Sequence, residues 1–301
     1  MSAAAELGQG VKAVIPAAGM ATRFLPATKA VPKELFPVID KPVLQHIVEE
    51  AAAAGIGDVL LVTGRGKTSM VDHFDRRPDL EQRLTERGDK ERLEAVIAPS
   101  ELSEIYTCRQ SEPLGLGHAV SYAETHMHGE PFAVLLADEF IDPKHELLSR
   151  MLELQQRTGG IVLALLEVPP EAVSRYGVAA IEAAPDSDDV VRVTGLVEKP
   201  PADEAPSNLI LIGRYVLPPA IFGAIKETEP GRGDEIQLTD AMARLLDKGV
   251  PVHGIVFRGT RHDTGEPAGY LRTIVELAWD RDDMGQFRDW LATFMEEQKD
   301  A

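Results

Sequence analysis

Apolar runs of strand length that alternate with helical segments constrain the fold of this chain more than any other feature. Strands are expected over residues 11–16, 58–63, 105–109, 131–137 and 161–168, and helices over 42–54, 81–94, 118–128 and 145–157. A run with no polar alternation is buried on both faces, which is typical of a parallel sheet covered by helices on either side. The first half therefore predicts an α/β fold whose ligand site lies at the carboxyl ends of the strands.

The second half has a different pattern from about residue 167. Segments 177–182, 190–198 and 208–216 are richer in turns and antiparallel in style, so a small β-rich lobe is expected over about 167–216. Helices over 219–226 and 235–248 and a strand over 252–257 follow. We therefore expect residues 1–280 to form a single α/β domain, a Rossmann-like, mostly parallel mixed sheet flanked by helices, followed by a C-terminal helix over 281–301.

The C-terminal tail, residues 267–300, is expected to be helical and carries an apolar stripe. The stripe consists of Trp279, Phe287, Trp290, Leu291, Phe294 and Met295. Two interpretations stay open at this point: the stripe packs on the body of its own chain, or it forms the subunit interface of a homo-oligomer. The sequence does not distinguish a dimer from a tetramer.

The overall charge excludes several classes of partner. A formal net charge of −18 on 301 residues argues against nucleic-acid binding, which needs a basic face, and against an anionic membrane surface. The longest apolar runs have the length of strands, far short of a membrane span. The single cysteine excludes an intrachain disulfide, and the first residues lack the basic head and apolar centre of a signal peptide. We expect a cytoplasmic protein.

One short region reverses this charge, because bases outnumber acids between residues 11 and 48. The bases are Lys12, Arg23, Lys29, Lys33 and Lys41, and the acids are Glu34 and Asp40. A loop of small residues, 17–22, follows the first expected strand, and its backbone N–H groups can approach a ligand closely. This combination favours an anionic ligand such as a nucleoside triphosphate, with a divalent cation as a second source of positive charge.

A series of separated blocks, from about residue 11 to about residue 277, gives the most specific signal. The blocks are AAGMATRFLPATKAVPKE, VTGRGK, RQSEPLGLGHAV, FAVLLAD, EVPPEAVSRYG, GLVEKP, APSNLILIGRYVL, GDEIQLTDA and RHDTGEPAGYL. In this order they resemble the sugar-phosphate nucleotidylyltransferase family. The EVPPE and NLILIGRYVL blocks favour its bacterial UTP–glucose-1-phosphate uridylyltransferase group over the thymidylyl and adenylyl groups.

The resemblance implies a transferase whose β-rich lobe binds a sugar. The reaction would be an in-line attack of a glucose 1-phosphate oxygen on the α-phosphorus of UTP, which releases pyrophosphate and forms UDP-glucose. Charge develops on the phosphoryl oxygens, so catalysis depends on positioning and charge stabilisation. UTP and glucose 1-phosphate are the expected substrates, and Mg²⁺ is the expected cofactor.

The resemblance also assigns roles to single residues. Of the three expected catalytic residues, Arg23 matches the loop arginine that contacts the triphosphate, Lys33 matches a lysine near the phosphates, and Asp138 matches an acid that holds Mg²⁺. Asp263 matches a second Mg²⁺ ligand, since carboxylate oxygens suit this ion. The expected nucleotide-binding residues are Ala18, Gly19, Glu34, Gln110 and Gly115. The expected sugar-phosphate-binding residues are Gly177, Glu198, Lys199 and Gly213.

Structural alternatives stay open for some of these residues. Asp138 at a strand end could be a helix cap, and Glu198 with Lys199 could form a salt bridge in a turn. A further group is left as either structural or adjacent to the sugar, since an acid is favoured at a helix start, where Glu235 is expected. This group consists of Asp234, Glu235 and Asp240.

Two positions depart from the family pattern. Ala21 stands where the first loop usually has a second glycine, and it adds strain of roughly 1 kcal/mol if the backbone there needs a positive φ. Glu139 stands where the central strand usually ends in a second aspartate. Its side chain is longer by one methylene, so a direct role for this acid is doubtful.

Three functions remain open. The first is the Mg²⁺-dependent uridylyltransferase. The second is a related enzyme that uses another nucleotide or hexose phosphate. Uracil and thymine differ by one methyl group, and a pocket that accommodates a methyl group distinguishes the two bases by a binding free energy of only roughly 1–3 kcal/mol. The third is a non-catalytic regulatory paralogue, against which the retention of the basic and acidic residues named above argues.

Overall fold

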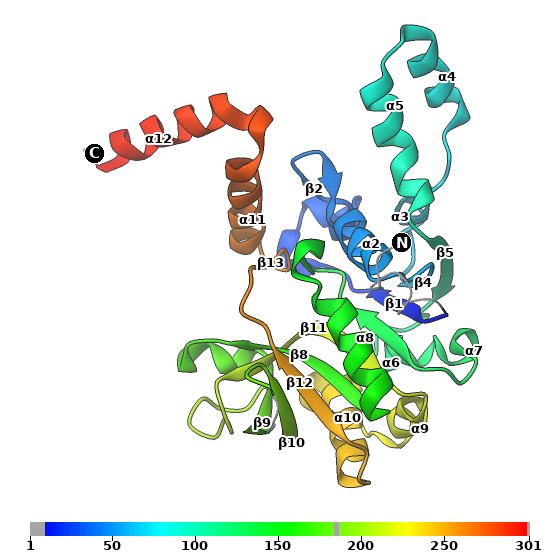
Figure 1. The fold of residues 1–301 in the computed structure, drawn as a ribbon, viewed down its shortest axis with the longest axis vertical. Helices are drawn as coiled ribbons and strands as arrows, with labels where there is room; N and C mark the ends of the chain where they lie inside the picture. Colours follow the sequence, from blue (N-terminus) through cyan, green and yellow to red (C-terminus); the bar gives the residue numbers. More distant parts are fainter. Residues whose placement is uncertain (1–9, 184–186, 300–301) are drawn as a thin grey trace.

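A nine-stranded mixed sheet lies at the centre of the computed structural model, which describes residues 10–183 and 187–299 (Figure 1). The strand order is β5-β4-β1-β6-β11-β8-β12-β10-β9, and only β10 and β11 run against the other strands of this sheet. The mostly parallel mixed α/β sheet is thus confirmed. Its strands are β1 (Lys12–Ala17), β4 (Asp58–Thr63), β5 (Glu104–Arg109), β6 (Phe132–Leu135), β8 (Ile161–Glu167), β9 (Gly177–Ala183), β10 (Val190–Glu198), β11 (Leu209–Leu217) and β12 (Val252–Val256).

Helices cover both faces of the sheet. The α-helices of the described residues are α2 (Val43–Ala53), α3 (Ser69–Asp72), α4 (Pro78–Arg87), α5 (Lys90–Ile97), α6 (Leu116–Ser121), α7 (Glu124–Met127), α8 (Leu147–Thr158), α9 (Ala220–Glu227), α10 (Leu238–Asp247), α11 (Pro267–Asp280) and α12 (Gly285–Lys299). Val14 of β1 packs in one core with α6, α9 and α10, whereas its neighbour Ile15 packs in a second core with α2 and α8. Successive residues of one strand are therefore both buried, which explains the apolar runs in the sequence.

Two expected helices are wrong as single elements. The charged segment 81–94 is divided between α4 and α5 by Gly88, which has a left-handed backbone (φ 69°), while Asp89 caps α5 by accepting from the Arg92 N–H at 3.3 Å. A glycine in this conformation ends a helix because it carries no Cβ to clash. Segment 118–128 is likewise divided between α6 and α7. The hairpin of α4 and α5 projects from the sheet in Figure 1.

The β-rich segment extends the main sheet and does not form a separate one. β10 pairs antiparallel with β9 and with β12, at one edge of the sheet. β11 lies between β6 and β8 in the middle, and its pairing with β8 shifts register between Leu211 and Tyr215. This irregularity lies beside the end of β6, where the sheet opens to form the site described below.

A short two-stranded ribbon crosses the end of the sheet. It pairs β7 (Glu139–Ile141) with β13 (Arg261–Asp263) in antiparallel register, so Glu139 lies opposite Asp263 and Phe140 opposite His262. Because side chains alternate along a strand, Glu139 and Asp263 share one face and Phe140 and His262 share the other. A second small hairpin pairs β2 (Pro37–Val38) with β3 (Lys41–Pro42).

The C-terminal helix α12 extends away from the body (red in Figure 1). None of its residues is buried, and the side chains of Trp290, Phe294 and Met295 are each exposed by 40% or more. The expected packing of the stripe on its own body is therefore not seen for Trp290, Phe294 and Met295, whereas Phe287 and Leu291 are half-buried. Over the described residues, no helix combines the length and apolar character that a bilayer crossing requires.

Candidate active site

The first expected loop lies at the carboxyl end of β1. Residues after Ala17 leave the sheet and enter a short 3₁₀ turn, Thr22–Phe24, which carries Arg23. Ala21 precedes this turn with a left-handed backbone (φ 49°, ψ 44°), so the condition for strain at this position is met. A methyl group in this region costs roughly 1 kcal/mol relative to glycine.

The loop forms one wall of a cavity of about 490 Å³, which we call the loop pocket. Every residue expected to bind the nucleotide lines it, together with the basic loop residues and the acid at the end of β6. These residues are Ala18, Gly19, Arg23, Lys33, Glu34, Gln110, Gly115 and Asp138.

A second cavity of about 570 Å³, the ribbon pocket, adjoins the first at the β7–β13 ribbon. Every residue expected to bind the sugar phosphate lines it, as does the second expected metal ligand. These residues are Gly177, Glu198, Lys199, Gly213 and Asp263. Arg23, Asp138 and Gly265 line both pockets, so the two form one cleft with these residues at the junction.

Glu34 is held by a lysine that sequence reasoning did not single out. Its side chain is 1% exposed, and Lys67 Nζ donates to both of its carboxylate oxygens at 2.9 and 3.0 Å and to the Ala17 carbonyl at 2.6 Å. The VTGRGK block contained the signal, because it places Lys67 just after β4, the neighbour of β1. Lys67 therefore fixes the acid that closes the inner end of the loop pocket.

Gly115 is needed where two segments meet. Its backbone has φ 107°, and a Cβ there would lie 2.8 Å from the backbone nitrogen of Ile236. The neighbouring hydrogen bond from the Ile236 N–H to the Leu114 carbonyl, 2.8 Å long, holds the segments together. Gln110, which is 7% exposed, forms a 2.9 Å side-chain hydrogen bond with the His118 ring. Only glycine fits at residue 115, so this wall of the pocket is bare backbone.

Asp138 stands at the corner between β6 and β7, and it caps no described helix, so the helix-cap alternative is wrong. Lys33 Nζ donates to its Oδ2 at 2.8 Å. Desolvation favours the protonated acid, but the positive charges of Lys33, Arg261 and Arg23 outweigh it and lower the pKa of Asp138. The carboxylate is therefore ionised at neutral pH.

The carboxylates of Asp138 and Asp263 face each other across Gly265. Asp138 Oδ2 and Asp263 Oδ1 each lie 3.2 Å from the position that a Cβ on Gly265 would take. No cluster of three or more acidic, histidine or cysteine ligands occurs among the described residues. Two carboxylates at a glycine-lined gap fit Mg²⁺, because this ion keeps several waters and takes its other ligands from substrate phosphates.

Glu139 lies in the wall of the ribbon pocket, and both of its carboxylate oxygens already have partners within the protein. The residue is 3% exposed, and its side chain accepts from the Gly213 N–H and from Arg261 Nε. Arg261 in turn donates from Nη2 to Asp263 Oδ2 at 2.9 Å. The acid that replaces the family's second aspartate therefore has a structural contact to the opposite strand of the ribbon.

Glu198 and Lys199 do form an ion pair, with Lys199 Nζ 3.0 Å from Glu198 Oε1. Thr239 donates to the other Glu198 oxygen at 2.7 Å, which fixes the carboxylate at the floor of the ribbon pocket. Lys199 has a positive φ of 46°, a conformation that non-glycine residues rarely adopt. The salt-bridge alternative is thus confirmed as a contact, within a pocket that can also admit a ligand.

The three acids that the sequence left unassigned differ in their position relative to the cleft. Glu235 lines both pockets, whereas Asp234 and Asp240 line neither. α10 begins at Leu238, so the expectation that Glu235 opens this helix is wrong. Burial, followed by the charge of Glu198, raises the pKa of Asp240.

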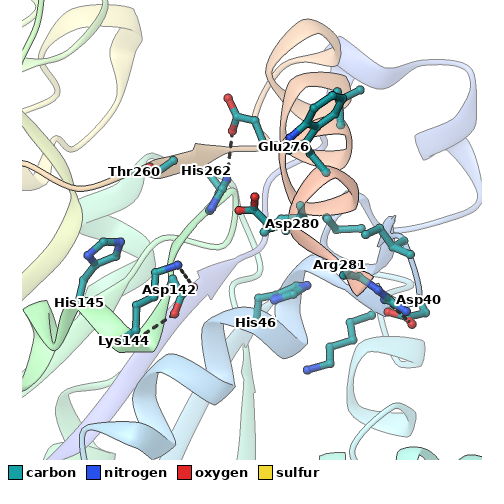
Figure 2. Close-up of a pocket in the computed structure, with 16 residues that line it drawn as sticks. Asp40, His46, Asp142, Lys144, His145, Thr260, His262, Glu276, Asp280 and Arg281 are labelled. Atoms are coloured by element: carbon teal, nitrogen blue, oxygen red, sulfur yellow. Dashed lines mark hydrogen bonds and ion pairs between the residues drawn. The ribbon is translucent and has the colours of Figure 1, made fainter. Parts of the chain in front are cut away.

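A separate cavity of about 730 Å³ lies behind the ribbon, between α2 and α11 (Figure 2). Phe140 stacks on His46 at 4.4 Å between ring centroids and on His262 at 4.9 Å. Burial lowers the pKa of His46 to about 4, so its ring is neutral at physiological pH. None of the expected site residues lines this cavity.

Comparison with known proteins places this cleft in a family. The chain matches the family model described as nucleotidyl transferase over residues 12–299. It is 45% identical over 285 residues to a UTP–glucose-1-phosphate uridylyltransferase of Bacillus subtilis (strain 168), covering 95% of this chain and 96% of that protein. It is 44% identical over 267 residues to the protein of that name from Staphylococcus haemolyticus (strain JCSC1435), covering 89% and 92% of the two chains.

Solved structures agree with the sequence comparison. UDP-glucose pyrophosphorylase complexed with UDP-glucose superposes with a TM-score of 0.80 at 39% identity, covering 90% of this chain and 99% of that one. UTP-bound UGPase from Acinetobacter baumannii superposes with a TM-score of 0.85 at 36% identity, covering 94% and 98%. The chain, with its two-pocket cleft at the carboxyl ends of a mostly parallel sheet, belongs to the nucleotidyl transferase family.

Proposed function

We propose that this protein is a UTP–glucose-1-phosphate uridylyltransferase that forms UDP-glucose and pyrophosphate. A sugar-phosphate oxygen attacks the α-phosphorus of UTP, and the bond from that phosphorus to the pyrophosphate oxygen breaks. The observation that carries the proposal is the shared lining of the two pockets by Arg23 and Asp138. A nucleotide in the loop pocket and a sugar phosphate in the ribbon pocket would meet at this junction, which supplies the required proximity.

The loop pocket would hold UTP. Its small residues leave backbone N–H groups accessible, and Gln110 can both donate to and accept from a uracil edge. The side chain of Arg23 is 65% exposed and lies 4.0 Å from Glu266 in a loose ion pair, so its guanidinium can turn to the triphosphate. Lys33 would exchange its bond with Asp138 for phosphate oxygens once a metal neutralises that carboxylate.

Asp138 and Asp263 would hold Mg²⁺. Bound there, the ion would neutralise charge on the phosphoryl oxygens. The protein's own contribution at Asp138 is to keep the carboxylate ionised, because the positive charge of Lys33, whose Nζ donates to Oδ2 at 2.8 Å, lowers the pKa of this acid.

The ribbon pocket would hold glucose 1-phosphate. Glu198 accepts hydrogen bonds and would take those of sugar hydroxyls, while Lys199 would pair with the phosphate. A Cβ on Gly177 would lie 3.1 Å from Glu198 Oε2, and one on Gly213 would lie 2.5 Å from Glu139 Oε1. The lack of a side chain at these two glycines therefore lets Glu198 and Glu139 lie close against the backbone in the wall of the pocket.

We further propose that the protein is a cytoplasmic homo-oligomer. Within the part of the chain that the structure describes, no residue of α12 is buried, and a helix of 15 residues without a buried side chain has little stability alone. A second subunit would supply the missing contacts. Sedimentation of the full chain beside a chain that ends at residue 281 tests this, and equal subunit numbers for the two would contradict it.

The proposed activity is tested by measuring pyrophosphate release with each nucleoside triphosphate and each hexose 1-phosphate, with and without Mg²⁺. We expect release only with UTP, glucose 1-phosphate and Mg²⁺ together. A different preferred pair would make the protein a relative of other specificity. No release with any pair would overturn the catalytic assignment in favour of a regulatory role.

A further inference from the structure

A chain of buried charges links the core of the protein to the cleft. It alternates in sign, and its members come from α2, β11, β7 and β13. In order, they are Glu50, Arg214, Glu139, Arg261 and Asp263. Of these five residues, Asp263 is the one proposed above as a metal ligand.

The inner end of this chain is rigid. Arg214 is 0% exposed and donates to Glu50 through two bonds of 2.8 and 2.7 Å. It also donates to the backbone carbonyls of Gly213 at 2.8 Å and Glu139 at 2.9 Å. Each of these hydrogen bonds helps to fix β7 or β11. The planar guanidinium of Arg214 can form them with little loss of side-chain conformational entropy.

The outer end of the chain reaches the proposed metal ligand. Arg261 bridges two acids, with Nε donating to Glu139 and Nη2 donating to Asp263 Oδ2. The other oxygen of Asp263 accepts from the Gly265 N–H at 3.0 Å and faces Asp138. Arg261 thus decides which oxygen of Asp263 turns to the gap where the ion would lie.

The side chain of Glu139, one methylene longer than that of aspartate, contacts two strands at once. One of its oxygens accepts from the Gly213 N–H on β11, and the other accepts from Arg261 on β13. A single side chain on β7 therefore ties the ribbon to the central sheet. A shorter acid at this position would have to give up one of these two contacts.

We propose that Arg261 is a positioning residue that orients Asp263 for the metal, and that Glu139 and Arg214 hold Arg261 in place. This inference rests on the proposed function. Arg261 acts through Asp263, because its Nη2 donates to Asp263 Oδ2 at 2.9 Å while its Nε is held by Glu139. Lysine cannot replace it, because one ammonium cannot span two acids in a fixed fork.

The test is direct binding of Mn²⁺, as a spin probe for Mg²⁺, to the full-length protein with UTP, corrected by a titration of UTP without protein. We expect Arg261→Lys to weaken Mn²⁺ binding tenfold to a hundredfold, as loss of a group that orients a metal ligand does. The matched control is Arg150→Lys, which changes an exposed arginine paired with Asp189 at 2.6 Å and should leave binding unchanged.

Steady-state kinetics and a second variant distinguish a positioning role of Arg261 from a general loss of structure. Arg261→Lys should lower kcat while the KM for glucose 1-phosphate changes less than twofold. Glu139→Gln, which keeps the chain length, should also weaken Mn²⁺ binding, and the double variant should be less impaired than the product of the two effects.

The outcomes are distinguishable. Wild-type Mn²⁺ affinity in Arg261→Lys overturns the inference and leaves the proposed function intact. A raised KM for glucose 1-phosphate with unchanged Mn²⁺ affinity also overturns it, in favour of direct contact between Arg261 and the substrate. A wild-type protein that binds Mn²⁺ with UTP but releases no pyrophosphate contradicts the proposed function alone.

Discussion

The two halves of the cleft are built in opposite ways. The loop pocket is walled largely by small residues and bare backbone, as at Gly19 and Gly115. Of its two basic side chains, Arg23 is mostly exposed and Lys33 pairs with Asp138. The ribbon pocket is formed by charged side chains that hold one another, from Glu198 and Lys199 to Arg261 and Asp263. A backbone wall tolerates small changes in side chains, whereas a wall of paired charges transmits a change at one member to the others.

The largest effect should come from breaking the buried end of the charged wall. Arg214→Met leaves Glu50 buried without its cation and removes one of the two cations beside Glu139, which costs about 3–5 kcal/mol of stability. Urea unfolding monitored by circular dichroism measures this cost. Arg150→Met, which removes an exposed arginine, should cost less than about 1 kcal/mol. Equal losses in the two variants would show that the internal network contributes no more than a surface ion pair.

Asp138→Asn tests the junction of the two halves. The amide cannot supply the charge that a metal ligand needs, so kcat should fall on the order of a hundredfold to a thousandfold, or about 3–4 kcal/mol. Pyrophosphate release measures the rate, and circular dichroism checks that the fold persists. A near-normal rate in a folded variant would remove Asp138 from the metal site.

Lys199→Ala should weaken binding in the ribbon pocket and leave binding in the loop pocket unchanged. Loss of a charged hydrogen bond to phosphate costs about 1.5–3 kcal/mol, which raises the KM for glucose 1-phosphate about tenfold to a hundredfold. The KM for UTP should change little, as steady-state kinetics with each substrate varied in turn would show. The control is Lys226→Ala, which removes an exposed partner of Glu124. An unchanged KM for the sugar phosphate would contradict the role of Lys199.

Ala21→Gly should produce the smallest effect, because it changes only a backbone wall. Relief of strain at φ 49° is worth roughly 1 kcal/mol. The greater freedom of glycine in the unfolded chain offsets about 0.4–1 kcal/mol of this gain. We expect urea unfolding to show a net gain below about 0.5 kcal/mol. Ala30→Gly, at φ −120°, has no such strain to relieve and should lose stability. A loss of more than about 1 kcal/mol in Ala21→Gly would show that the methyl group packs usefully.

Sequence patterns predicted the sheet well and the helix breaks poorly. The strand over 58–63 matches β4 at both ends, because a buried run between turns has sharp limits. The helix over 81–94 was wrong because periodicity continues across Gly88, and only its left-handed backbone separates α4 from α5. The sequence also did not determine what the apolar stripe of α12 packs against, because such a stripe predicts a contact but does not identify the partner.

The residues of the cleft could be named from sequence, but their partners could not. Arg23 and Lys33 lie in one block, and Asp138 and Asp263 lie in two others. The order of these blocks along the chain was the signal that grouped the four residues. Nothing local predicts that Lys67 reaches Glu34, or that Arg214 pairs with Glu50 far away in the sequence. These pairs depend on which strands are neighbours, a long-range property that periodicity does not contain.

The sequence by itself determined the α/β sheet, the cationic loop and the set of residues at the cleft, because each follows from local composition or from a specific series of blocks. Only the tertiary structure decided that Asp138 and Asp263 face each other across Gly265, and that Glu139 is buried between two strands. The physical reason is that charged groups in a low-dielectric interior need partners within hydrogen-bonding distance, and folding alone brings such partners together from distant parts of the chain.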